Sequence, residues 1–174
     1  MCGIVGYIGR EKKAEKVVLE GLYRLEYRGY DSAGLAYVEN DNIKVVRAKG
    51  AVKGLDEKCQ SIQPQDLAIG HTRWATHGKP SEANAHPHKS FKGKLALVHN
   101  GIIENYRYLK EALKDEGYMF SSETDTEVLA NWIEHTMLQL SLPLEDAVHE
   151  ALKSVHGAYA IAVIEPSGDM IVCA

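Results

Sequence analysis

The sequence lacks any hydrophobic run long enough to cross a membrane. Its longest apolar stretches have the length of a strand, whereas a transmembrane helix needs about 20 apolar residues. The apolar stretch at 3–8 is also too short for a signal peptide, and the charged run at 10–13 follows it at once. We therefore expect no membrane anchor and no secretion signal.

Cysteine is scarce, and its pattern argues against a disulfide framework. The three cysteines, Cys2, Cys59 and Cys173, are odd in number and far apart. Such usage is typical of proteins from a reducing compartment. We expect a cytoplasmic location.

An excess of positive charge is also missing. The net charge is −4, and Lys and Arg are scattered rather than gathered in stripes. This distribution argues against nucleic acid or an anionic membrane as the main partner.

The sequence contains none of the glycine-rich motifs that bind dinucleotides or phosphates, and no G-x-S-x-G elbow. We expect no cofactor. Several histidines fall in or beside one loop region, namely His71, His77, His86, His88 and His99. They have no cysteine or acidic neighbour at the usual ligand spacing, so we expect them to pack and hydrogen-bond rather than to bind zinc.

What the sequence does contain is the composition and periodicity of one globular domain. It has 174 residues, 45% hydrophobic and 25% charged. Helical spacing of apolar residues predicts helices at 12–27 and 52–59, then helices marked by Tyr106, by the segment 124–127 and by Pro143. Short apolar runs predict strands at 3–8, 35–38, 43–46, 67–70, 95–98, 158–164 and 170–172. The strands cluster instead of alternating strictly with helices, which predicts an α+β fold with antiparallel sheet and helices outside.

The first two residues suggest a nucleophile. If Met1 is removed, Cys2 carries a free α-amino group with a pKa of about 7.7–8.0, a few bonds from its own thiol. Nucleophile and base would then belong to one residue. The alternative is that Cys2 is an inert small residue at the start of a strand, which is the usual role of a free cysteine.

Asn100 and Gly101 follow directly on a predicted buried strand. The pair most often forms a hairpin turn, but here a helix follows. An Asn amide and an exposed Gly N–H could also form an oxyanion hole. Spacing alone favours neither interpretation.

Arg73 and Asp125 could recognise opposite charges of one ligand. An arginine fork suits a carboxylate, although a surface salt bridge is the simpler role. Asp125 begins a predicted helix, where the default role is N-terminal capping. Facing a pocket instead, the two would bind the zwitterionic end of a free amino acid.

Longer motifs carry a resemblance to a known family. The opening MCGIVGYIG, with LEYRGYDSAG at 25–34, HTRWATHGKPSEANAHPH at 71–88, VHNGIIEN at 98–105 and SETDTEV at 122–128, resembles class II glutamine amidotransferases. These enzymes have an N-terminal nucleophile fold. Within the family, the combination is most similar to the glutaminase domains of glucosamine-6-phosphate synthases.

The resemblance implies a four-layer αββα sandwich that cleaves the side-chain amide of glutamine. Ammonia would pass to a separate domain that converts fructose 6-phosphate into glucosamine 6-phosphate. The implied catalytic residues are Cys2 as nucleophile, Asn100 and Gly101 as the oxyanion hole, and Arg28, which with Gly29 lines the nucleophile. The implied substrate-binding residues are Arg73 for the carboxylate, Asp125 for the ammonium, and Trp74, Thr76 and His77 in a loop that covers glutamine. His86 and His99 lie nearby without an assigned role.

Two features depart from the family pattern. Retained Met1 would turn the Cys2 nitrogen into an amide that cannot accept a proton. Family glutaminase domains also continue beyond residue 174, so we expect a domain that is incomplete at its C-terminus. We expect the full-length enzyme to be a homo-oligomer.

Two other functions remain as alternatives to a glutaminase domain of this kind. One is the glutaminase part of another amidotransferase, such as amidophosphoribosyltransferase or asparagine synthetase. The other is a catalytically silent glutamine-binding module.

Overall fold

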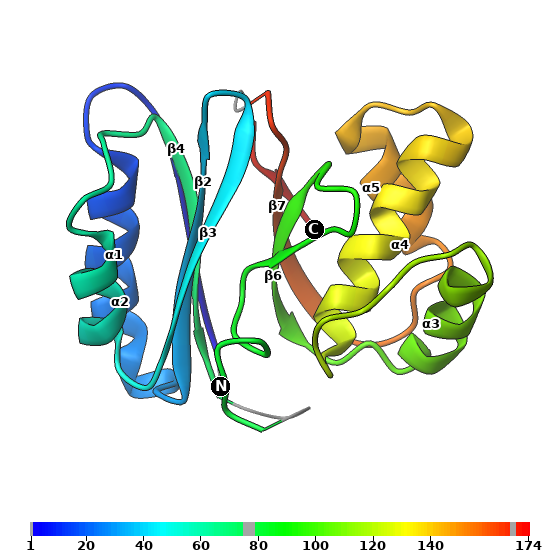
Figure 1. The fold of residues 1–174 in the computed structure, drawn as a ribbon, viewed down its shortest axis with the longest axis horizontal. Helices are drawn as coiled ribbons and strands as arrows, with labels where there is room; N and C mark the ends of the chain where they lie inside the picture. Colours follow the sequence, from blue (N-terminus) through cyan, green and yellow to red (C-terminus); the bar gives the residue numbers. More distant parts are fainter. Residues whose placement is uncertain (1, 75–78, 168–169) are drawn as a thin grey trace.

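Two antiparallel four-stranded sheets pack face to face in the computed structural model, which describes residues 2–74, 79–167 and 170–174. Helices cover the outer face of each sheet, so that the layers run helix, sheet, sheet, helix (Figure 1). The predicted α+β class and the αββα order implied by the resemblance are both confirmed.

The first sheet is built from the N-terminal half of the chain. Its spatial order is β1 (Gly3–Ile8), β4 (Leu67–Arg73), β2 (Ser32–Glu39) and β3 (Asn42–Lys49). Its outer face is covered by α1 (Ala14–Leu25) and α2 (Val52–Cys59), through an apolar cluster that includes Val18, Leu22 and Leu55. A short 3₁₀ turn, η1 (Glu26–Arg28), follows α1.

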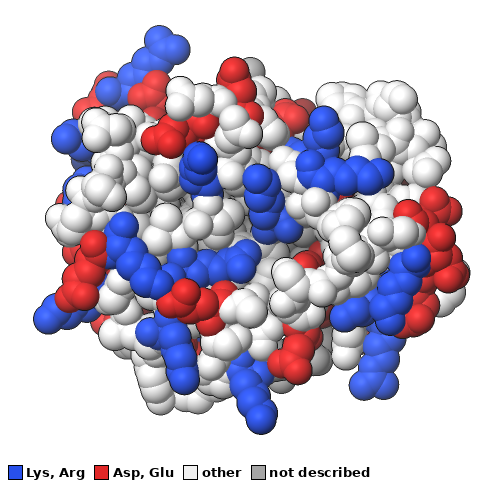
Figure 2. Space-filling view, in the orientation of Figure 1, with Lys and Arg blue, Asp and Glu red and all other residues white. Residues whose placement is uncertain are grey.

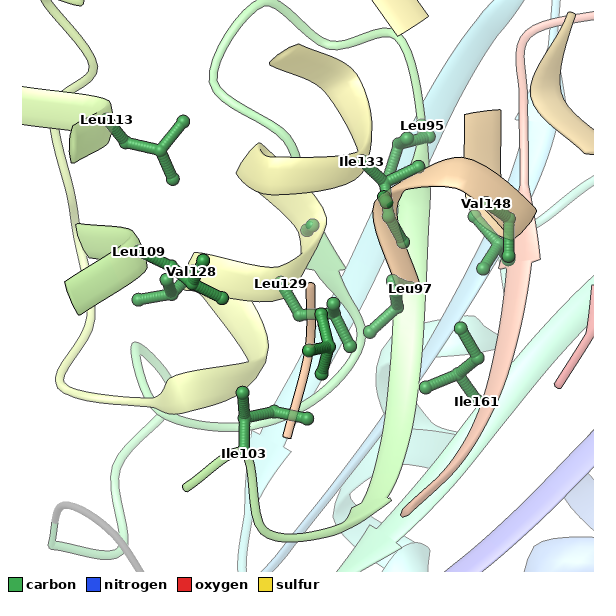
Figure 3. Close-up of a cluster of buried hydrophobic side chains, with 14 of the residues drawn as sticks. Leu95, Leu97, Ile103, Leu109, Leu113, Val128, Leu129, Ile133, Val148 and Ile161 are labelled. Atoms are coloured by element: carbon green, nitrogen blue, oxygen red, sulfur yellow. The ribbon is translucent and has the colours of Figure 1, made fainter. Parts of the chain in front are cut away.

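The second sheet contains β5 (His88–Lys89), β6 (Ala96–Gly101), β7 (Tyr159–Ile164) and β8 (Val172–Cys173), in that order. The helices α3 (Tyr106–Asp115), α4 (Asp125–Leu140) and α5 (Leu144–Leu152) cover it. Figure 3 shows how Leu129 and Ile133 of α4 meet Leu97 of β6 in the core between these layers.

A third apolar cluster lies between the sheets. It combines small and branched residues from both, among them Ala36, Ile69, Val98 and Ala162. All of β4 is buried because α1 covers one face and the second sheet covers the other. Burial on both faces explains why this strand carries no alternating polar pattern.

Several strand boundaries differ from the sequence-based expectation. β4 continues to Arg73 and β6 continues to Gly101, each beyond the predicted apolar run. β5 lies in a region predicted to be loop. His71 and Asn100 can lie in these extensions because their side chains are hydrogen-bonded to each other inside the sandwich, at 2.9 Å.

Basic and acidic side chains are interspersed on the face shown in Figure 2. Within the described residues, no helix combines the length and the apolar character needed to span a membrane.

Gly34 lets β2 pass close to the backbone of His86. A Cβ at this position would overlap the carbonyl oxygen of His86, which is backbone and cannot rotate away. We predict that Gly34→Ala lowers the free energy of unfolding by about 1–3 kcal/mol, measured by chemical denaturation.

The matched control is Gly54→Ala in α2. The added Cβ would have only an ordinary contact there, 3.7 Å from the Cβ of Ala48. Alanine favours the helix by up to about 1 kcal/mol, so this variant should be at least as stable as the parent. Equal loss of stability in both variants would contradict the assigned close approach.

Candidate functional site

A cavity of about 540 Å³ lies where β1, β4, β6 and β7 meet the start of α4. Every predicted site residue that the structure describes lines it, namely Cys2, Arg28, Arg73, Trp74, Asn100, Gly101 and Asp125. His86 and His99 also line it. Thr76 and His77 lie outside the described residues. Segments that are far apart in the sequence therefore meet at one place.

Cys2 is held beside Trp74 by strand pairing. Gly3 pairs with Thr72, so the residue before β1 lies next to the end of β4. The backbone N–H of Trp74 donates to Cys2 Sγ at 3.2 Å, and Sγ lies 3.6 Å from the Trp74 carbonyl oxygen. These contacts fix the direction of the sulfur at the cavity wall.

Asn100 and Gly101 form the last two positions of β6. They pair with Ala160 and Tyr159 of β7, so the hairpin-turn interpretation is wrong. Asn100 Nδ2 donates to the carbonyl oxygen of Cys2 at 3.2 Å. An amide donor is thus in direct contact with the residue that carries the thiol.

Gly101 has a backbone conformation that favours glycine, with φ of 125°. A Cβ there would also overlap the carbonyl oxygen of Ala158. Only glycine lets the two backbones approach this closely at the end of β6.

Arg73 and Asp125 are both buried and both line the cavity. Burial lowers the pKa of the Arg73 guanidinium, while the charges of Cys2, Asp31 and Asp125 oppose that effect. Arg73 ends β4, and Asp125 begins α4. The buried cation therefore comes from the first sheet, and the buried anion comes from the helical layer that covers the second sheet.

The predicted capping role of Asp125 is wrong. Thr124 is the N-cap of α4, because its Oγ1 accepts the Glu127 N–H at 3.2 Å. Asp125 Oδ2 instead accepts the backbone N–H of Ile103 at 2.9 Å. With the helix capped by its neighbour, the Asp125 carboxylate is directed to the segment after β6 and to the cavity.

Arg28 reaches the cavity from the 3₁₀ turn after α1. Its neighbour Gly29 lies against the backbone of Arg73 and Trp74, where a Cβ would come within 2.8 Å of the Arg73 carbonyl carbon. The 28–29 segment is thereby packed against the end of β4. This contact brings the Arg28 side chain next to the site.

A cluster of four buried histidines lies beside the cavity and consists of His71, His86, His88 and His99. The ring centroids of His71 and His86 lie 4.2 Å apart, and those of His86 and His88 lie 5.1 Å apart. Burial lowers the pKa of His71 to about 3 and those of His86 and His88 well below the usual value. His99 Nδ1 is hydrogen-bonded to Thr126 Oγ1 at 2.9 Å.

Nothing among these histidines resembles a metal centre in the part of the chain that the structure describes. There, no three His, Cys, Asp or Glu side chains are grouped so that they could hold a metal ion. His71 Nε2 instead lies 2.9 Å from Asn100 Oδ1. Sequence reasoning missed this contact because the two residues belong to different sheets and share no spacing pattern.

The family model described as "Glutamine amidotransferase domain" matches residues 37–174. The chain belongs to the glutamine amidotransferase family. It is 52% identical to the glutamine–fructose-6-phosphate aminotransferase (isomerizing) of Caldanaerobacter subterraneus and 53% identical to that of Thermus thermophilus. Both matches cover 100% of this chain and 28% of the relative, so the chain spans little more than a quarter of these proteins. The sequence-based resemblance is confirmed.

Solved structures of the family share the fold. Glutamine phosphoribosylpyrophosphate amidotransferase from B. subtilis matches with a TM-score of 0.79 and 28% identity, over 95% of this chain and 35% of that one. A structure described as the allosteric regulatory enzyme of purine biosynthesis matches with a TM-score of 0.81 and 29% identity, over 95% and 36% of the two chains.

The three cysteines differ enough to predict selective labelling. Cys2 lines the cavity, whereas Cys59 is buried and its pKa is raised to about 11 by burial. Cys173 is exposed and does not line that cavity. A diazo-ketone analogue of glutamine should therefore modify Cys2 alone, as measured by peptide mass spectrometry.

Iodoacetamide is the control reagent, because it has no glutamine-like part and should also modify the exposed Cys173. Equal labelling of Cys2 and Cys173 by the glutamine analogue would show that the cavity does not select the reagent.

Proposed function

We propose that this chain hydrolyses the side-chain amide of glutamine through a cysteinyl acyl-enzyme. The observation that carries the proposal is the contact between Asn100 Nδ2 and the Cys2 carbonyl, in a cavity that also holds Arg73 and Asp125. A thiol, an amide donor, a buried cation and a buried anion suit one small zwitterionic amide. The cavity volume of about 540 Å³ is in the usual range for small-molecule sites.

The first chemical step requires removal of Met1, which frees the α-amino group of Cys2. That amine takes the thiol proton, and the thiolate sulfur attacks the amide carbon of glutamine. The carbonyl electron pair moves onto oxygen, where Asn100 Nδ2–H and the Gly101 N–H stabilise the negative charge. When the intermediate collapses, the C–N bond breaks and the Cys2 ammonium gives its proton to the departing NH₂ nitrogen, which leaves as NH₃.

Water completes the cycle. The Cys2 amine takes a proton from the water as its oxygen attacks the thioester carbon. The C–S bond then breaks, the thiolate regains a proton from the ammonium, and glutamate leaves. The same two oxyanion donors serve both steps because the negative charge forms on the same oxygen.

Substrate recognition is assigned to groups that do not react. Arg73 would pair with the α-carboxylate and Asp125 with the α-ammonium, each a charge-assisted hydrogen bond. Trp74 would cover the substrate together with Thr76 and His77, and Arg28, which lines the same cavity as Cys2, would support the nucleophile.

The use of the ammonia is a further part of the proposal. The relatives with 52–53% identity are named for transfer to fructose 6-phosphate, whereas the glutamine phosphoribosylpyrophosphate amidotransferase from B. subtilis has 28% identity. This difference favours an amino-sugar product over a phosphoribosylamine. We accordingly propose a cytoplasmic, homo-oligomeric synthase in which this chain is the glutaminase domain and the sugar chemistry belongs to other domains.

Cys2→Ala should abolish glutamine-dependent release of ammonia, because no other group in the cavity can form the thioester. The measurement is a coupled glutamate dehydrogenase assay, with circular dichroism to verify the fold. Intact mass should first establish that Met1 is absent from the parent protein. Turnover that survives in a folded Cys2→Ala variant would refute the acyl-enzyme mechanism, and an inactive parent lacking Met1 would favour a silent binding module.

Asn100 should act on the transition state, whereas Arg73 and Asp125 should act on binding. Asn100→Ala is expected to lower kcat by about 10²- to 10³-fold with little change in KM. Arg73→Ala and Asp125→Ala should mainly raise KM, because they contact charges that do not change during the reaction. Steady-state glutamine kinetics check both, and the reverse pattern would reverse the assignments.

A further inference from the structure

His71 lies where β4 passes under the end of β6. It is fully buried, and it pairs with Ile4 on one side and Gly34 on the other. Its Nε2 lies 3.0 Å from the carbonyl oxygen of His99 and 2.9 Å from Asn100 Oδ1. One imidazole nitrogen thus faces two oxygen atoms of consecutive residues.

The backbone carbonyl of His99 determines the tautomer of His71. A carbonyl oxygen can only accept a hydrogen bond, so Nε2 must carry the proton. An Nε2–H in turn requires an acceptor from Asn100, which is the amide oxygen and not the amide nitrogen. The orientation of the Asn100 amide therefore follows from a backbone group that cannot change its role.

The other end of the amide leads to the same orientation. The group that faces Cys2 lies 3.2 Å from a backbone carbonyl oxygen, so it must be the NH₂ group. One of its two protons satisfies that carbonyl. The second proton remains for an oxygen atom of the ligand in the cavity, which Asn100 also lines.

We propose that His71 is a positioning residue, which holds the Asn100 amide with its nitrogen toward Cys2 and its oxygen away from the cavity. The inference rests on the proposed function. A reversed amide would present an oxygen to the negatively charged oxygen of the intermediate and turn a stabilising contact into a repulsive one. His71 would thus act on the reaction through Asn100 without touching the substrate.

The surroundings keep His71 neutral with a single N–H. Burial lowers the pKa of its imidazole to about 3. The charges of His99 and Arg73 act in the same direction, whereas the hydrogen bonds to Asn100 and to the His99 carbonyl oxygen oppose it. Nδ1 has no hydrogen-bond partner among the described residues, and the ring packs on His86, whose pKa is lowered as well. The bond to Asn100 is therefore available at every pH at which a glutaminase would work.

Two substitutions of similar shape separate the hydrogen bond from the packing. In His71→Gln, the side-chain NH₂ can replace Nε2–H, whereas His71→Met has a similar length and no donor. We expect His71→Gln to keep kcat within about threefold and His71→Met to lower it by about 10- to 100-fold with little change in KM. Equal kcat values for the two variants would overturn the proposal.

The double variant His71→Met/Asn100→Ala tests whether His71 acts through Asn100. Once the amide is gone, loss of His71 should cost no more than about a further twofold in kcat. A full additional loss would mean that His71 acts by another route. Leu113→Ala in α3 is the stability control, since it removes core packing in the helical layer and should lower the melting temperature without lowering kcat.

A spectroscopic measurement tests the inference separately from the proposed function. Long-range ¹H–¹⁵N correlation spectra of the full natural protein should show His71 as the neutral Nε2–H tautomer between about pH 5 and 8. A protonated Nδ1 would overturn the proposal even if the variants fail to fold. If the parent lacks glutaminase activity but shows this tautomer, the proposed function is refuted, whereas the inference that His71 orients the Asn100 amide is supported.

Discussion

Pairing of β1 with β4 is the interaction on which the site depends. The six paired positions run from Gly3 opposite Thr72 to Ile8 opposite Leu67, with every residue of β4 buried. A chain terminus normally frays, and here a complete set of ladder contacts prevents it. Cys2 is consequently placed beside Trp74 by backbone geometry rather than by its own side chain.

The close approach of the two sheets brings the polar residues at the ends of β4 and β6 near Cys2. Small residues such as Gly34 and Ala36 line the inner faces, and the polar ends of β4 and β6 meet across the gap. His71 and Asn100 can touch only because no large side chain separates these strands. Backbone carbonyl oxygens accept at both ends of this contact, since His71 Nε2 lies 3.0 Å from the His99 carbonyl oxygen and Asn100 Nδ2 donates to the Cys2 carbonyl oxygen.

Sequence patterns predicted much of the fold. The parts that they failed to predict share one physical cause. The spacing of Val18 and Leu22 predicted α1, and the apolar runs predicted most strands. The extensions of β4 to Arg73 and of β6 to Gly101 were missed because polar residues in a doubly buried strand resemble loop. The site residues were predicted from their resemblance to family motifs and not from periodicity, and their chemical roles remain predictions. The bond between His71 and Asn100 had no local signal, since it joins different sheets.

Thr124 and Asp125 show why the start of α4 is suited to change. Two adjacent residues could both have capped this helix, and tertiary structure assigned the task to the uncharged one. Helix stability and the charge presented to the cavity are therefore carried by separate side chains. An engineer, or evolution, could replace the carboxylate at 125 to admit an uncharged or anionic ligand while the cap at 124 keeps the helix in place.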